Sequence, residues 1–279
     1  MFRVENLSRK DFEFAVKITD MMHWGLSYAD FEFMLEIEPE GCFVLCEETE
    51  RIGIATTVSF GKIGWFGNLV VVENHRNKGA GSFLVEYSLE YLKRRKVQTV
   101  GLYAYVERIP FYERLGFEYD SDFVFLKGEG SSQRSRSDTI LARAQDFDSI
   151  IAFDRACFGA SRKKLLQPIL QYRDNLCFTK IKNDEIVGYV VVKMFKGGTE
   201  VGPLVCQPGH AEVAIELLEA VLDRLQGLKT SLCIAKRESV ILDALRVAGF
   251  AESYHVARML RGPQTLKECI CGAESLERG

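Results

Sequence analysis

One pattern occurs twice in this chain, about one domain length apart. Glu50-Arg-Ile-Gly53 before an apolar run resembles Glu185-Ile-Val-Gly188, whose glycine lies 135 residues further on. Arg114-Leu-Gly-Phe117 resembles Val247-Ala-Gly-Phe250, at an offset of 133 residues. The repeats of solenoid proteins are far shorter, whereas an offset of this size is a typical domain length. The pattern therefore predicts two domains with the same order of elements.

A polar segment separates the two copies. Residues 127–138 are rich in glycine and serine and show no apolar periodicity, which is typical of a linker. We expect a first domain over residues 1–128, a linker over 129–138, a second domain over 139–262 and a loose C-terminal tail over 263–279.

The composition excludes several classes of protein. Of the 279 residues, 47% are hydrophobic and 27% are charged, as in a globular protein. No apolar run reaches the length of a membrane span, and Met1–Lys10 contains no signal-peptide core. The net charge of −3 gives no reason to expect nucleic acid as a partner, and the basic run Lys93–Lys96 suits a helix C-terminus. The sequence predicts a cytoplasmic protein.

The eight cysteines are predicted to be reduced and to bind no metal. Four of them lie inside apolar, strand-like runs: Cys42, Cys177, Cys206 and Cys233. There a reduced cysteine packs as a small hydrophobic residue. The close pairs Cys42–Cys46 and Cys269–Cys271 have no neighbouring histidines or second close pair, so a zinc site is not expected.

Apolar periodicity gives the same order of elements in both halves. The first half is expected to contain strands at Phe2–Asn6, Cys42–Glu47, Ile52–Phe60, Ile63–Val72, Thr99–Tyr105 and Phe117–Leu126, and helices at Asp11–Met22, from Tyr28, at Ser82–Arg95 and at Pro110–Leu115. The second half repeats this order from Thr139 to Arg261. The predicted fold class is α/β (α+β), with two tandem domains that each contain a mixed, mostly antiparallel sheet flanked by helices.

The segment Val71–Ser82 contains the pattern that points to chemistry. An apolar strand runs into a short loop with Gly79 and Gly81, and an amphipathic helix follows at once. Backbone N–H groups at such a helix N-terminus can bind phosphate oxygens, and Arg76 and Lys78 add positive charge. The spacing is neither that of a P-loop nor that of a Gly-x-Gly-x-x-Gly fingerprint. It indicates an anion site of another kind.

Two motifs of the first half together resemble one family, the GCN5-related N-acetyltransferases (GNAT proteins). Arg76-x-x-Gly79-x-Gly81, between an apolar strand and a helix, resembles the signature that binds the pyrophosphate of acyl-CoA in this family. Further along the chain, Pro110-Phe-Tyr112-Glu-Arg-Leu-Gly-Phe117 resembles its second marker. The resemblance covers residues 1–128 and implies an N-acetyltransferase that uses acetyl-CoA as co-substrate and requires no metal.

Residues 139–262 resemble a degenerate domain of the same family. Leu204–His210 stands where the phosphate-binding loop should be, but it is shorter and lacks the glycine pattern. Leu245 takes the place of Tyr112. The resemblance therefore implies two tandem GNAT-like domains of which the first is catalytic, while the second completes the acceptor cleft or mediates dimerisation.

The resemblance also implies roles for individual residues. Backbone groups of Leu69, Val70 and Val71 would pair with the pantetheine arm, and a backbone N–H near Val71 would stabilise the thioester oxygen. Arg76 and the main-chain amides that follow it would hold the pyrophosphate: Asn77, Lys78, Gly79, Ala80, Gly81 and Ser82.

Tyr112 is the candidate general acid. A phenol with a pKa of about 10 can protonate the departing CoA thiolate and remains un-ionised at neutral pH. The alternative is a half-buried tyrosine that packs on the sheet. The general base stays open, because the strand before the loop contains no glutamate or histidine. The alternatives are a water relay or one of His23, Asp30, Glu32 and Glu73.

The acceptor amine is expected to bind near His23, Trp24, Tyr28 and Phe60. Three of these are aromatic and would line an apolar pocket, or they would simply pack in the core. Residues 30–50 contain eight acidic and no basic side chains, which would attract a cationic amine or form a solvated face.

The sequence thus predicts transfer of the acetyl group of acetyl-CoA to a primary amine, by direct attack in a ternary complex. The partners are acetyl-CoA and an amine acceptor, with neither nucleic acid nor membrane, and a homodimer is one of the open oligomeric states. The alternative function is a non-catalytic acyl-CoA sensor or a protein-interaction module.

Overall fold

The first repeat folds with the predicted order of elements. The computed structural model describes residues 1–131, 138–264 and 266–279. Its first half contains the strands β1 (Phe2–Asn6), β2 (Cys42–Glu47), β3 (Glu50–Phe60), β4 (Ile63–Val71), β5 (Thr99–Tyr105) and β6 (Glu118–Glu129), and the helices α1 (Phe12–Asp20), α2 (Tyr28–Ile37), α3 (Ala80–Arg94) and α4 (Ile109–Glu113). Local signals set these bounds: Ser27 and Asp30 form a capping box that opens α2, and Gly116, at φ 81°, follows α4.

The second repeat has the same order. Its strands are β7 (Ile140–Leu141), β8 (Leu176–Lys182), β9 (Glu185–Phe195), β10 (Gly198–Cys206), β11 (Lys229–Ala235) and β12 (Ala251–Arg261), its helices are α5 (Phe147–Phe158), α6 (Lys163–Gln171), α7 (Ala211–Arg224) and α8 (Ser239–Val247), and a further short strand, β13 (Ile270–Gly272), follows. Among the described residues, no helix is long and apolar enough to cross a membrane.

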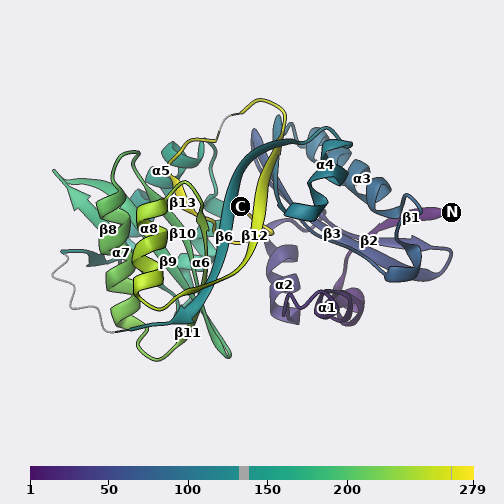
Figure 1. Ribbon diagram of the computed structural model, residues 1–279. Coiled ribbons are helices and arrows are strands. Elements are labelled where there is room, and N and C mark those ends of the chain that lie inside the picture. The colour runs from purple at the N-terminus through teal and green to yellow at the C-terminus, as the bar shows by residue number, and fades with distance from the viewer. Residues whose placement is uncertain (132–137, 265) are drawn as a thin grey trace.

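The two repeats exchange their last long strands. The thirteen strands of the described chain form one sheet in the order β1-β2-β3-β4-β5-β12-β6-β11-β13-β10-β9-β8-β7. β12 of the second repeat pairs antiparallel with β5 of the first, and β6 of the first pairs antiparallel with β11 of the second. β6 and β12 also pair with each other, and they lie side by side at the centre of the molecule (Figure 1).

The predicted fold class is therefore confirmed, as a mixed and mostly antiparallel sheet flanked by helices. The division into 1–128 and 139–262 stays a prediction, and each of these halves contributes a strand to the sheet of the other. Within the predicted linker 129–138, residues 132–137 lie outside the described residues.

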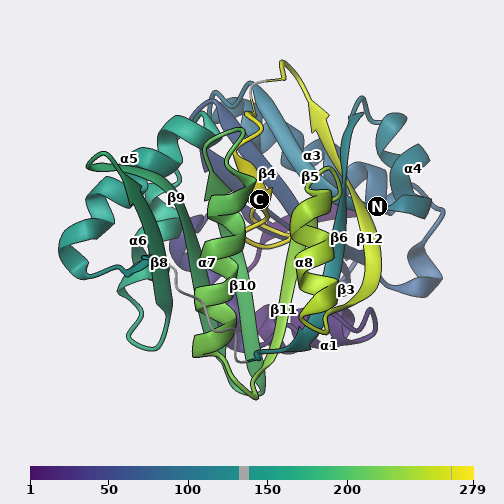
Figure 2. The ribbon, with the colours of Figure 1, turned by 60° about the vertical axis from the view of Figure 1, so that its left-hand side comes forward.

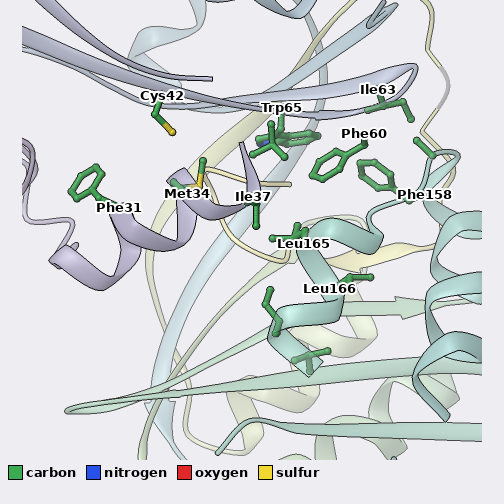
Figure 3. Close-up of a cluster of buried hydrophobic side chains, with 14 of the residues drawn as sticks. Phe31, Met34, Ile37, Cys42, Phe60, Ile63, Trp65, Phe158, Leu165 and Leu166 are labelled. Carbon is green, nitrogen blue, oxygen red and sulfur yellow. The ribbon is translucent and has the colours of Figure 1, made fainter. Parts of the chain in front are cut away.

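The repeats also share a core. Helices α1 and α2 of the first repeat and α5 and α6 of the second bury their apolar faces in one cluster, part of which Figure 3 shows. Phe60 of β3 packs edge-to-face against Phe158 of α5, with ring centroids 5.7 Å apart. The opposite face of the sheet is covered separately in the two repeats, by α3 in the first and by α7 and α8 in the second. All eight cysteines are free and buried.

A buried ion pair lies in the second repeat. The Arg162 guanidinium donates to both carboxylate oxygens of Asp154, at 3.1 and 2.6 Å, and both side chains are fully buried. The Tyr189 hydroxyl donates to the same carboxylate at 2.6 Å. Removing one member would leave the other charge buried without its partner, which is far more destabilising than losing an exposed pair.

The variant Asp154→Ala is therefore expected to lower the free energy of unfolding by about 3–5 kcal/mol. Asp148→Ala is the matched control, because the Asp148 side chain is 93% exposed and its nitrogen–oxygen distance to Lys163 is 3.7 Å. The control should lose at most about 1 kcal/mol. Urea unfolding followed by circular dichroism measures both free energies. Equal losses in the two variants would show that the buried ion pair is no more important for stability than the exposed one.

The segment after β12 is not the loose tail that the sequence predicted. Cys269, Ile270 and Cys271 are buried, and β13 pairs antiparallel with both β10 and β11. The chain then runs toward the middle of the molecule, where Figures 1 and 2 place its last residue. The physical reason is that β10 and β11 diverge, and a short apolar strand between them satisfies the backbone groups that would otherwise stay unpaired.

Candidate functional site

The first repeat contains a gap inside its sheet. β4 and β5 run parallel, but only Ile63–Trp65 pairs with Thr99–Gly101, and the two strands diverge beyond that point. A β-bulge interrupts β4 in the diverging part: Asn68, at φ 51°, and Leu69 together face a single residue of β3. Bulges of this kind are frequent beside active sites, because they redirect backbone groups. The gap therefore presents a strand edge to which an extended ligand can add.

The loop after β4 leads from this gap to the start of α3. Asn77, at φ 60°, and Gly79, at φ 83°, adopt the left-handed conformation that turns the chain sharply into the helix. Residues 77–79 are exposed, and the first turn of α3 contains no acidic side chain. Its backbone N–H groups and the positive end of the helix dipole thus form a surface on which an anion is stabilised.

The Arg76 side chain holds this loop in place. Its Nε donates to the main-chain oxygen of Val71 at 2.8 Å, and its Nη2 lies 3.7 Å from the Met22 sulfur. The guanidinium is thus turned back onto the end of β4. Its assignment to pyrophosphate binding stays a prediction, as do those of the residues that follow it.

The second repeat has the same strand geometry without the gap. β10 and β11 pair in parallel only over Thr199–Val201 and Thr230–Leu232, and β13 occupies the space beyond. The first turn of α7 already carries an acidic residue, Glu212, whose carboxylate contacts His210 at 3.0 Å and Lys182 at 3.3 Å. The hydrogen bond from His210 lowers the pKa of Glu212 to about 2. In the second repeat, β13 therefore occupies the gap and Glu212 occupies the helix end, so neither is free for an anionic ligand.

Tyr112 lies on α4, on the same face of the sheet as α3. Its ring packs edge-to-face against Phe66 and Phe117, and burial raises the pKa of its hydroxyl well above the ordinary value. The neighbouring Phe111 faces the start of α3, because a Cβ at Gly81 would meet its ring at 3.5 Å. The structure thus brings α4 beside the loop that the sequence singled out.

The predicted acceptor residues do not gather at one place. The Trp24 indole N–H donates to the Tyr105 hydroxyl at 3.0 Å, which puts Trp24 at the end of β5 beside the gap. His23 is exposed. Tyr28 is 53% exposed and packs on Phe12, whereas Phe60 is buried in the core shared by the repeats. Their roles in acceptor binding stay predictions.

The candidates for the general base lie elsewhere as well. The Asp30 carboxylate accepts from Ser27 and so caps α2, the Glu32 carboxylate pairs with Arg9 at the surface, and Glu73 is exposed. Leu276–Gly279, which were not predicted from the sequence as site residues, do lie beside the gap, on the face of the sheet that α1 and α2 cover. The only sequence signal toward them was the short apolar run Cys269–Cys271 that precedes them.

Comparison with known proteins agrees with this geometry. Residues 3–117 match the model of the acetyltransferase (GNAT) family, and residues 150–269 match that of an acetyltransferase (GNAT) domain. The chain is 26% identical to a holothin acyltransferase from Pseudoalteromonas sp. over 92% of this chain and 87% of that protein.

Two solved structures share the fold. One, from Pyrococcus horikoshii and assigned as an acetyltransferase, has a TM-score of 0.83 and 20% identity, and covers 100% of this chain and 96% of that one. A tandem GNAT protein from the clavulanic acid biosynthesis pathway has a TM-score of 0.61 and 12% identity over 95% and 100%.

Fold and matches together define an acyltransferase with two GNAT domains in tandem. The chain belongs to the GCN5-related N-acetyltransferase family.

Proposed function

We propose that the first repeat transfers the acetyl group of acetyl-CoA to a primary amine by direct attack in a ternary complex. One observation carries the proposal: among the described residues, no strand is inserted where β4 and β5 separate, and β4 leads to a helix end without an acidic residue, whereas β13 is inserted between β10 and β11 of the second repeat. In acetyl-CoA an extended pantetheine thioester is joined to a pyrophosphate, so the arm can pair with the strand edge while the anionic group binds at the helix end.

The proposed roles follow from these positions. Backbone groups of Leu69–Val71 pair with the pantetheine arm, and the amides of Asn77–Ser82 bind the pyrophosphate. Arg76 keeps the loop in its shape through the Val71 carbonyl. The second repeat supports the first, because β12 completes the sheet beside β5.

The chemistry proceeds through a tetrahedral intermediate. The amine nitrogen forms a bond to the thioester carbon, and the oxygen takes up negative charge beside a backbone N–H of β4. The carbon–sulfur bond then breaks, and Tyr112 protonates the departing thiolate. The nitrogen of the product loses its extra proton, which restores the tyrosine hydroxyl.

A calorimetric titration with acetyl-CoA is expected to give one binding site per chain. The reason is that β13 fills the second gap and Glu212 occupies the second helix end. Two sites would show that β13 gives way to the cofactor. The absence of binding would contradict the proposed function.

A panel of primary amines, assayed by release of the CoA thiol, then tests catalysis. Turnover with at least one amine is expected. Binding of acetyl-CoA without turnover of any amine would favour the alternative function, a non-catalytic acyl-CoA sensor.

A further inference from the structure

β4 carries no acid or base at the point where it leaves β5. Its residues from Ile63 to Val71 are apolar apart from Asn68, and Gly67 stands directly before the bulge. Another part of the chain fills the space above that glycine. A Cβ at Gly67 would lie 2.6 Å from the Cα and 2.7 Å from the Cβ of Glu277, which no side chain can tolerate. Only glycine allows Glu277 to dock here.

The segment Leu276–Arg278 connects the two walls of the gap. Leu276 packs against a small buried cluster that includes Phe123 of β6 and Val256 of β12, and Tyr105 of β5 packs against the same cluster. The Arg278 guanidinium lies over the Phe33 ring of α2, 5.4 Å from its centroid. Because Gly67 points to the same side of β4 as Trp65, in the core of α1 and α2, the segment covers the face opposite α3. It therefore lies across the gap from the phosphate-binding loop.

The charges around Glu277 are one cation short. Among the described residues, the ion pairs around Glu277 join three carboxylates to two cations: Glu200, Glu274, Glu277, Lys193 and Arg278. Arg162, a third buried cation that acts on Glu274, is already paired with both oxygens of Asp154. Lys193 and Arg278 both contact Glu274, at 2.7 and 3.0 Å. Glu277 therefore shares Arg278, the cation that it contacts, with Glu274. Buried charges are normally paired, and a protonated amine would complete the balance.

Glu277 is also only partly buried. Its Oε1 contacts Arg278 Nη1 at 2.7 Å, and the side chain is 16% exposed, more than either Glu274 or Arg278. Beside it, the Trp65 ring lies against Gly279, and the buried indole N–H has no hydrogen-bond partner among the described residues. An unsatisfied buried donor at this place is a second sign that a polar ligand belongs here.

We infer that Glu277 binds the ammonium group of the acceptor and accepts the proton that this group must lose before attack. The inference rests on the proposed function and names its substrate class, an alkylamine that is protonated at neutral pH. The step balances: the ammonium and the carboxylate become a neutral amine and a carboxylic acid, the amine attacks the thioester, and Glu277 later returns its proton to water.

The surroundings of Glu277 suit a proton acceptor. Burial raises its pKa, the neighbouring Arg278 opposes this, and Glu200 and Glu274 add to the increase. The titratable and charged groups that face it come from its own segment and from β9, β10 and β12: Arg278, Glu274, Lys193, Glu200 and Tyr254. A carboxylate with a raised pKa takes a proton more readily than a solvated one.

The test compares Glu277→Gln with Glu200→Gln, which removes one negative charge from the same cluster without touching Gly67. The substrates are an alkylamine that the wild type acetylates and an arylamine, which is uncharged at neutral pH. Glu277→Gln is expected to lower kcat/KM for the alkylamine about 100-fold or more. For the arylamine it should change kcat/KM only a few-fold, and acetyl-CoA binding by calorimetry should stay unchanged.

The pH dependence gives an independent readout. In Glu277→Gln, alkylamine turnover should rise about tenfold per pH unit between pH 7 and 9, because only amine that is already neutral can react. The wild type should depend on pH less steeply. Equal losses for both amines, or the same loss in Glu200→Gln, would overturn the role of Glu277. If the wild type acetylates no amine, the proposed function itself fails.

Discussion

Gly81→Asp is expected to abolish measurable acetyl-CoA binding. Position 81 lies in the first turn of α3, where no acidic side chain is present, and a carboxylate there would face the proposed pyrophosphate site. Two unit charges about 4 Å apart at an effective dielectric constant of about 20 repel by about 4 kcal/mol, which is roughly a 10³-fold increase in Kd. Calorimetry measures the loss directly.

Two variants separate this electrostatic effect from damage to the fold. Gly81→Ala should bind nearly as well as the wild type, because its Cβ would meet Phe111 at 3.5 Å, an ordinary contact. Ala211→Asp puts the same charge at the start of α7 and should leave binding unchanged. If Gly81→Asp still binds acetyl-CoA within about tenfold of the wild type, the pyrophosphate does not lie at α3.

Tyr112→Phe is expected to lower kcat by about 10²–10³-fold with little change in the affinity for acetyl-CoA. The variant keeps the ring that packs on Phe66 and Phe117 and removes only the hydroxyl. Since burial raises the pKa of Tyr112, the hydroxyl stays protonated at neutral pH and can serve as a donor. Thiol release at saturating acetyl-CoA measures the effect.

Tyr87→Phe is the matched control for this prediction. Tyr87 also lies on the α3 face, where its ring packs edge-to-face on Phe43 at 5.2 Å, and it has no role in the proposed chemistry. It should keep turnover near that of the wild type. Turnover of Tyr112→Phe that matches this control would remove Tyr112 from the role of general acid.

The elements of each repeat could be predicted because their signals are local. Periodicity, caps and glycines placed β1, β2 and β5 at their observed bounds and put the other elements of the first repeat within a few residues. The exchange of β6 and β12 could not be predicted in this way. The two strands occupy equivalent places in the two repeats, so either could pair beside β5 from sequence alone. Tertiary packing selected β12.

The two sides of the candidate site also differ in whether their residues are close together in the sequence. The loop proposed to bind phosphate is one contiguous segment, so its glycines and basic residues could be recognised together. The proposed acceptor side joins Gly67 to Glu277, which are 210 residues apart in the chain. No local pattern links a glycine in a strand to a glutamate near the end of the chain, and a short apolar run such as Cys269–Cys271 reads as a tail.

By itself, the sequence determined the duplicated order of elements, the fold class and the family, because these depend on periodicity and contiguous motifs. The tertiary structure decided which strands pair, where β13 is inserted and which segment docks on Gly67 of β4. These depend on contacts between residues distant in the chain, where the burial of apolar surface and the pairing of backbone groups in one sheet outweigh any local preference.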